Sequence, residues 1–201
     1  MTPKKKRAAE LMAELEADPT FRAQQREREQ LRLRDAGELA RAEAPLLRAL
    51  TEVGLDVKSV WDLVNRATRH YPEAVPVLID HIQRPYPDTV RAGIARALTV
   101  AEARPRWDFF MELYRKERGR HAKEGLAVAL SGIATDEVIG DVIALAKDQN
   151  NGRSRILLLS SVESSKDPRA HQALVELGTD PELRKQVHII LRRKKRSNHR
   201  L

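Results

Sequence analysis

From about residue 72 onward, apolar residues recur at helical spacing in segments that proline, glycine or aspartate interrupts at regular intervals. The segments fall into consecutive pairs, at 72–82 and 88–101, 105–118 and 120–133, 136–148 and 152–164, and 168–178 and 181–195. Apolar stripes at spacings of three and four residues are typical of amphipathic helices. The pattern therefore predicts four short helix pairs that follow one another along the chain.

The second helices of the four pairs resemble one another. A basic residue recurs in them at separations of 32, 32 and 29 residues, at Arg91, Lys123, Arg155 and Arg184. The positions three and seven residues later are always apolar, at Ile94 and Leu98, Leu126 and Leu130, Leu158 and Val162, and Val187 and Leu191. A single pair of about 30 residues cannot bury such a stripe, so each pair must stack on its neighbours. We predict an all-α fold in which these stripes face neighbouring pairs.

The first 44 residues are rich in charge and favour helix without a wide apolar face. Asp18 is a predicted N-cap, with Pro19 as the first position of a long helix. Before Leu39 the apolar positions are too sparse for several heptads. The sequence therefore allows two alternatives: this helix pairs with a second copy as a coiled coil, or its surface is exposed to solvent.

A regular apolar stripe begins at Leu39 and continues to Val53, and Gly54 is predicted to end this helix. A short helix over 59–69 follows. The predicted regions are a charged N-terminal helical extension (1–44), adapter helices (45–71), a repeat domain (72–191) and a basic C-terminal tail (192–201).

The residues that start the predicted helices support this division. Asp88 is a predicted N-cap for the helix that follows it. Three other starts carry proline at the first-turn position, in Arg104-Pro105, Asp167-Pro168 and Asp180-Pro181.

Two of these segments look like a known repeat. Asp88-Thr89-Val90-Arg91, followed by Gly93, Ile94, Ala97 and Leu98, resembles the second-helix signature of HEAT repeats, and Asp180-Pro181-Glu182-Leu183-Arg184 is similar to it. The resemblance covers about 125 of 201 residues. It implies a curved, armadillo-type α-solenoid that binds extended or helical partners. Neither middle repeat has an acidic residue three positions before its anchor, which argues against a continuous Asp–Arg ladder.

Composition excludes several classes of protein. The chain has no cysteine, which removes disulfide scaffolds, thiolate zinc sites and cysteine nucleophiles. It has no apolar run of about 20 residues, and charges stand where a signal peptide would have its apolar core. We therefore expect a cytoplasmic protein without a membrane span.

The net charge of +8 is concentrated in a short segment. Lys and Arg outnumber Asp and Glu by 10 to 9 in residues 1–44, by 21 to 20 in 45–191 and by 6 to 0 in 192–201. The five consecutive basic residues of the predicted tail are candidates for binding phosphates or an acidic partner: Arg192, Arg193, Lys194, Lys195 and Arg196. The other interpretation is a solvated helix end whose cations complement the terminal carbonyls. A second basic run, Lys4–Arg7, is followed closely by acidic residues.

No catalytic signature is present, and we expect neither an enzyme nor a cofactor. The six histidines are scattered and show no spacing suited to a metal. A partner is expected to bind on the second helices, where Ala92 and further candidates should be exposed in a groove: Arg96, Thr99, Glu124, Val128 and Ser131.

Trp61 and Trp107 are additional candidate anchors, because tryptophan is enriched at interface hot spots; packing in the core is the other interpretation. The pair Trp107-Asp108 superficially resembles the site of HEAT-like alkylpurine DNA glycosylases, but these need a basic face that the neutral charge balance of 45–191 does not predict. The sequence thus predicts a protein-binding scaffold, with a nucleic-acid-associated protein that uses the basic tail as the alternative.

Overall fold

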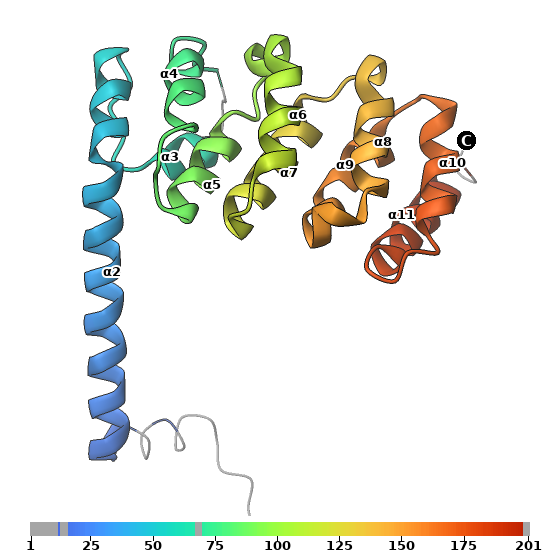
Figure 1. Ribbon diagram of the computed structural model, residues 1–201. Coiled ribbons are helices and arrows are strands. Elements are labelled where there is room, and N and C mark those ends of the chain that lie inside the picture. Colours follow the sequence, from blue (N-terminus) through green and yellow to red (C-terminus); the bar gives the residue numbers. More distant parts are fainter. Residues whose placement is uncertain (1–11, 13–15, 67–69, 199–201) are drawn as a thin grey trace, which may run out of the picture. The chain divides into compact units, whose positions relative to one another are not determined.

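The computed structural model, drawn in Figure 1, describes Met12 and residues 16–66 and 70–198. All regular structure within these residues is helical, which confirms the predicted all-α class. The predicted basic run at Lys4–Arg7 lies outside the described residues.

The α-helices are α2 (Pro19–Glu52), α3 (Val60–Asn65), α4 (Ala74–His81), α5 (Asp88–Ala97), α6 (Trp107–Lys116), α7 (Arg120–Ile133), α8 (Ile139–Lys147), α9 (Arg155–Ser164), α10 (Pro168–Leu177) and α11 (Arg184–Asn198). Short 3₁₀ helices occupy η1 (Ala101–Arg106), η2 (Asp136–Val138) and η3 (Gln149–Ser154).

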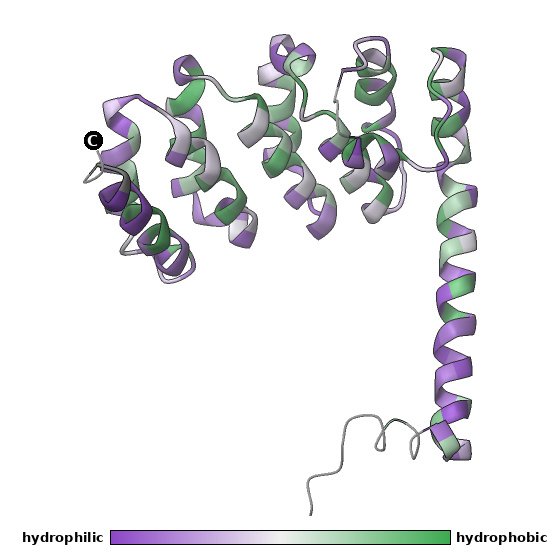
Figure 2. Cartoon of the chain, turned by 180° about the vertical axis from the view of Figure 1, so that it is seen from behind, coloured by the Kyte–Doolittle hydropathy of each residue, from purple (hydrophilic) through white to green (hydrophobic). Residues whose placement is uncertain are grey.

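The chain divides into two compact units, Met1–Ala42 and Glu43–Leu201. In the first unit, α2 begins at Pro19, and the Asp18 carboxylate accepts a hydrogen bond from the Thr20 N–H at 2.8 Å, as predicted for an N-cap. Most side chains of this unit are exposed, and its surface is largely hydrophilic (Figure 2). The sparse apolar pattern before Leu39 therefore corresponds to a solvated helix surface.

The second unit begins with the last turns of α2, where Leu46 and Leu50 are fully buried. The helix ends at Glu52, and Gly54 follows with a φ of 88°, the left-handed conformation that glycine adopts without strain. The buried Glu43 carboxylate accepts a hydrogen bond of 2.6 Å from the Val60 N–H and so connects α2 to the start of α3.

Four helix pairs follow in chain order: α4 with α5, α6 with α7, α8 with α9, and α10 with α11. Each second helix contacts the next one, α5 to α7, α7 to α9 and α9 to α11, and Figure 1 shows them side by side in sequence order. The predicted stripe residues Ile94, Leu126, Leu158 and Val187 are all fully buried. The two-helix periodicity was therefore a correct guide to the core, although Leu191 is only half-buried.

The second helices approach closely where their residues are small. A Cβ atom added at Gly125 of α7 would lie 2.7 Å from the Ala92 carbonyl oxygen and 3.0 Å from the Ala95 Cβ of α5. Only glycine permits this separation of the two backbones. Ala92 itself is buried, with 4% of its surface exposed, so its predicted position in an exposed groove is wrong.

The helix starts differ from the sequence prediction at Pro105 and at Asp88. Pro105 does not start a helix, because it lies inside η1 and α6 begins at Trp107. Asp88 is the first residue of α5 and does not cap that helix. Its carboxylate accepts hydrogen bonds of 2.8 Å from the N–H groups of His121 and Ala122, at the start of α7 in the next pair. The capping function is present, but it operates between pairs.

Two of the four basic anchors of the second helices, Arg91 and Arg155, also act between pairs. Arg91 forms an ion pair with Glu117, which precedes α7, and Arg155 forms ion pairs of 2.7 Å with Asp180 and Glu182, which precede α11. Lys123 lies 5.0 Å from the centre of the Tyr114 ring. The acidic partners of Arg91 and Arg155 thus come from the connection between the two helices of the next pair and not from the same helix.

Candidate functional site

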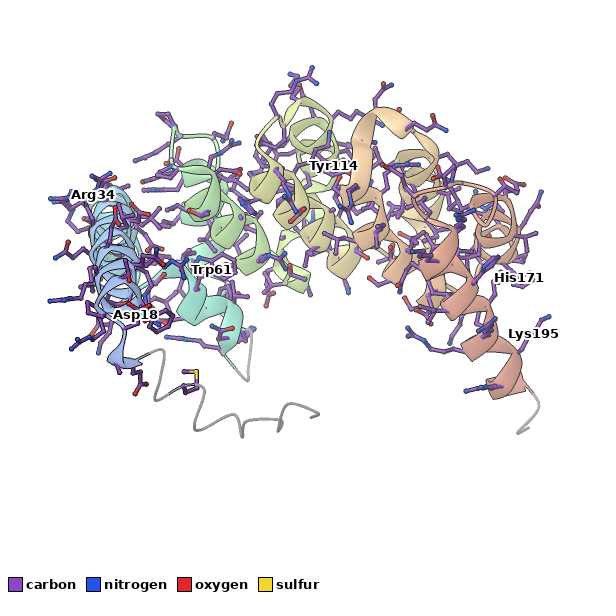
Figure 3. The ribbon with its side chains drawn as sticks, turned by 90° about the horizontal axis from the view of Figure 1, so that it is seen from below. Asp18, Arg34, Trp61, Tyr114, His171 and Lys195 are labelled. Carbon is purple, nitrogen blue, oxygen red and sulfur yellow. The ribbon has the colours of Figure 1, made fainter. Side chains whose placement is uncertain are left out.

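A groove of about 810 Å³ lies along the last helix pair. It is lined by Glu163 at the end of α9, by Ser165, Lys166 and Asp167 of the connection, by Pro168, His171 and Val175 of α10, and by His188, Leu191, Arg192, Lys194 and Lys195 of α11. Figure 3 shows His171 and Lys195 near one another at this end of the helix row. The groove has room for a segment of another molecule.

Helical periodicity positions the two sides of the groove. On α10 the lining residues stand at positions 168, 171 and 175, and on α11 mainly at 188, 191, 192 and 195, so each set forms one stripe along its helix. The opposite face of α10, with Ala170, Ala173 and Leu174, packs into the core. The same amphipathic pattern that stacks the pair therefore leaves the second face of both helices available.

The lining of the groove is partly apolar. Val175 has 54% of its surface exposed, and Leu191 is half-buried. His171 and His188 are exposed on α10 and α11. An apolar side chain of a ligand would bury apolar surface here, and this burial favours binding by about 25 cal/mol per Å² of apolar area.

The two carboxylates of the groove already have basic partners. The Asp167 carboxylate accepts hydrogen bonds from the Arg169 guanidinium at 2.7 and 3.0 Å and from the Arg169 N–H at 2.8 Å. The side-chain hydrogen bond from Arg169 holds the pKa of Asp167 below its ordinary value, so this cap of α10 stays ionised. Glu163 lies 3.5 Å from the Arg193 guanidinium.

Several cations of the groove are available to a ligand. In the part of the chain that the structure describes, no ion pair engages Lys166, Arg192 or Lys194. Their charges therefore exceed those of the carboxylates, and the site attracts anionic groups.

The predicted basic residues do not form a separate tail, because α11 continues through all five of them to Asn198. Arg192, Lys194 and Lys195 line the groove, whereas Arg193 pairs with Glu163 and Arg196 is exposed outside the lining. The last turns of α11 are correspondingly hydrophilic (Figure 2).

The residues predicted on the second helices have different positions. Arg96 and Val128 are half-buried on α5 and α7, and Glu124 is half-buried with its carboxylate 3.3 Å from Arg120. Thr99 is half-buried after α5, where its Cγ2 would lie 2.1 Å from a Cβ added at Gly132.

Ser131 contributes to a contact between helices. Its Oγ lies 2.6 Å from the Ser160 Oγ and accepts a hydrogen bond of 3.0 Å from the Ser161 N–H of α9. Ser131 and Thr99 therefore help to join consecutive second helices.

The two tryptophans lie on different elements. Trp61 has 38% of its surface exposed on α3, and its indole covers Gly93, since a Cβ added there would lie 3.1 Å from the Trp61 Nε1. Trp107 is half-buried at the start of α6, and its Nε1 donates to the Asp141 carboxylate at 3.0 Å. This hydrogen bond joins α6 to α8, while Asp108 is exposed.

Lys166, His171 and Val175 line the groove but were not predicted as site residues. The sequence contains one indication of this side of the groove. Val175 is apolar but does not belong to the stripe formed by positions 170, 173, 174 and 177, which is buried.

No group of three or more metal-ligating carboxylate, histidine or cysteine side chains occurs in the described residues. Among the helices described, none combines the length and apolar character that crossing a bilayer requires. Comparisons of the chain with models of protein families, with curated proteins and with solved structures find no match.

Proposed function

We propose that this protein is a HEAT-like α-solenoid that works as a non-enzymatic scaffold, and that a peptide or helical segment of a partner protein lies in the groove of the last pair. The observation that carries this proposal is the groove itself, whose lining contains the exposed Val175 of α10 and the half-buried Leu191 of α11. An apolar strip with a polar rim is the usual composition of a site for a peptide segment.

The arrangement of the helix pairs supports a scaffold. Each pair contacts its neighbours in chain order, which is the organisation of repeat proteins whose stacked helices offer extended binding surfaces. The resemblance of the Asp88 and Asp180 segments to HEAT repeats points in the same direction.

Nucleic acid is the alternative ligand, since Lys166, Arg192, Lys194 and Lys195 give the groove a basic side. Three observations favour a protein segment. The groove contains two carboxylates, its lining has no Trp, Tyr or Phe on which bases could stack, and residues 45–191 carry 21 basic against 20 acidic side chains.

The proposal can be tested with a pair of matched substitutions. Val175→Glu places a charge in the groove lining, whereas Ile189→Glu places the same charge on an aliphatic side chain that is 46% exposed on α11 and does not line the groove. Affinity capture with the full chain, after nuclease treatment, should recover a defined protein partner with the wild type and with Ile189→Glu. Val175→Glu should lose it while keeping the same thermal unfolding temperature.

A partner that disappears with nuclease treatment would favour the nucleic-acid alternative. A partner retained by Val175→Glu and lost with Ile189→Glu would place the binding site on another face of α11.

A further inference from the structure

The groove is not uniform along its length. Because α10 and α11 are consecutive helices joined by a short turn, they run antiparallel, and Pro168 lies toward the last turns of α11 while Val175 lies toward His188. Seven residues of helix separate Pro168 from Val175, a distance of about 10 Å. The groove therefore has two distinct ends about 10 Å apart.

The end near Pro168 carries the positive charge. Lys166 and Arg192 are exposed there, and Lys194 lies close to them in the lining. Three carboxylates lie at this end: Asp167 is paired with Arg169, Glu163 with Arg193, and Asp136 accepts hydrogen bonds from the Ser165 hydroxyl and the Lys166 N–H. The charge of Asp136 is smaller than the combined charge of Lys166, Arg192 and Lys194, so the end stays positive for a ligand. The end near Val175 is apolar, with no ion pair of its own among the described residues.

We infer that the groove selects an acidic segment of its partner protein, with carboxylates at the Lys166–Arg192 end and one apolar side chain on Val175. This inference rests on the proposed function and adds the chemistry of the ligand. Complementary charge gives such a site its specificity, and the apolar contact fixes the register of the segment. A short groove with a single apolar pocket suits a brief peptide better than the long phosphate track of a nucleic acid.

The probe is a short fluorescein-labelled peptide that carries a run of glutamates and, about 10 Å further along its extended backbone, a leucine. Its binding to the full chain is followed by fluorescence polarisation. Two comparison peptides replace the glutamates by glutamines or the leucine by serine, and a labelled single-stranded DNA tests the other class of ligand. We expect the glutamate–leucine peptide to bind most tightly and its affinity to fall with added salt.

Two double substitutions remove the same charge from different places. Lys166→Gln with Arg192→Gln removes two cations from the basic end of the groove, whereas Lys185→Gln with Arg184→Gln removes one lysine and one arginine from exposed positions of α11 outside the lining. The first pair should raise the Kd of the acidic peptide about tenfold, and the second pair should change it less than about twofold.

The outcomes separate the inference from the proposed function. Equal binding of the glutamine peptide would overturn acid selectivity and leave a peptide groove in place. Absence of binding by all three peptides, or equal losses in the two double variants, would also overturn the inference. Tighter binding of DNA that the Lys166–Arg192 variant abolishes would overturn both the inference and the proposed function.

Discussion

Two interfaces hold neighbouring helix pairs together with different chemistry. One lies between α5 and α7, and the other lies between α9 and the last pair. In the first, Gly125 and Ala92 let two backbones approach so closely that no added methyl group fits without movement. In the second, the guanidinium of Arg155, only 2% exposed, lies between Asp180 and Glu182 at 2.7 Å from each. The first junction adds the ion pair between Arg91, 20% exposed, and Glu117 to its close packing, whereas at the second junction the guanidinium itself is buried.

The largest effect should follow from removing the buried charge on one side only. Arg155→Met leaves the Asp180 carboxylate, 11% exposed, without its cation, and unpairing of a buried charge is strongly destabilising. Because Glu182 is 46% exposed and can be solvated, we expect a loss of about 3 kcal/mol in the free energy of unfolding. Urea unfolding of the full chain measures this difference.

Arg184 provides the control for that substitution, since it is the corresponding anchor of the last pair and is exposed. Arg184→Met should change the unfolding free energy by less than about 0.5 kcal/mol. If both variants lose the same free energy of unfolding, the burial of Arg155 does not contribute to the stability of this junction.

The next largest effect should come from the close-packed interface. In Gly125→Ala the new methyl group meets the Ala92 carbonyl, which belongs to the backbone and cannot rotate away. Overpacking of this kind lowers the free energy of unfolding by about 1–3 kcal/mol, and the higher helix propensity of alanine offsets up to about 1 kcal/mol of this loss. We expect a net loss of about 1–2 kcal/mol.

Gly140→Ala in α8 makes the same chemical change where space is available. The nearest atom to its added Cβ would be the Arg169 Nη1 at 3.4 Å, at the end of a flexible side chain. This variant should be stabilised by up to about 1 kcal/mol. If both alanine variants shift in the same direction, the spacing of α5 and α7 is not the cause.

Acid should distinguish the two interfaces. The hydrogen bond from Arg155 holds the pKa of Asp180 below its ordinary value of 3.8. The stability that this carboxylate contributes is therefore present above about pH 4 and is lost as the pH falls through its folded pKa. The loss caused by Arg155→Met should be constant from about pH 7 to about pH 4 and shrink below about pH 4, whereas the loss caused by Gly125→Ala should stay constant throughout.

The helix pairs could be predicted from the sequence because burial imposes a regular stripe. Ile94, Leu126, Leu158 and Val187 are buried where the stripe placed them, since a side chain at helical spacing has one face to occupy. Asp88 shows the limit of this reasoning. An aspartate before a helix predicts a cap, but only the stacking of pairs determines that its carboxylate reaches the N–H groups of α7.

The groove was predicted in part. The run from Arg192 to Arg196 identified the basic side by charge alone, but charge does not say which residue of a helix faces a neighbour. Arg193 turns to Glu163, while Arg192 and Lys194 line the groove. The other side depends on how α10 packs on α11, so Val175 could be recognised as exposed only once its helix was oriented.

The smallest expected effect belongs to the contact between α6 and η3, in which one neutral hydrogen bond is removed. The Tyr114 hydroxyl of α6 lies 2.7 Å from the Ser154 Oγ of η3, and Ser154 donates its own proton to the Asn151 carbonyl at 2.7 Å, so Tyr114 must be the donor. Tyr114→Phe removes one neutral hydrogen bond and should cost about 1 kcal/mol. Burial raises the pKa of Tyr114 to about 12, above its ordinary value of 10.

This shift gives the Tyr114 hydrogen bond a pH dependence opposite to that of the Arg155 ion pair. A group whose folded pKa is raised contributes its stability fully below the unfolded value, so the contribution of Tyr114 should be complete below about pH 10 and decline as the pH rises toward 12. The difference between wild type and Tyr114→Phe in urea unfolding should therefore shrink in alkali and stay constant in acid. A difference that shrinks in acid instead would show that the hydroxyl acts through the charged network around Arg155, and the three junctions would no longer be independent.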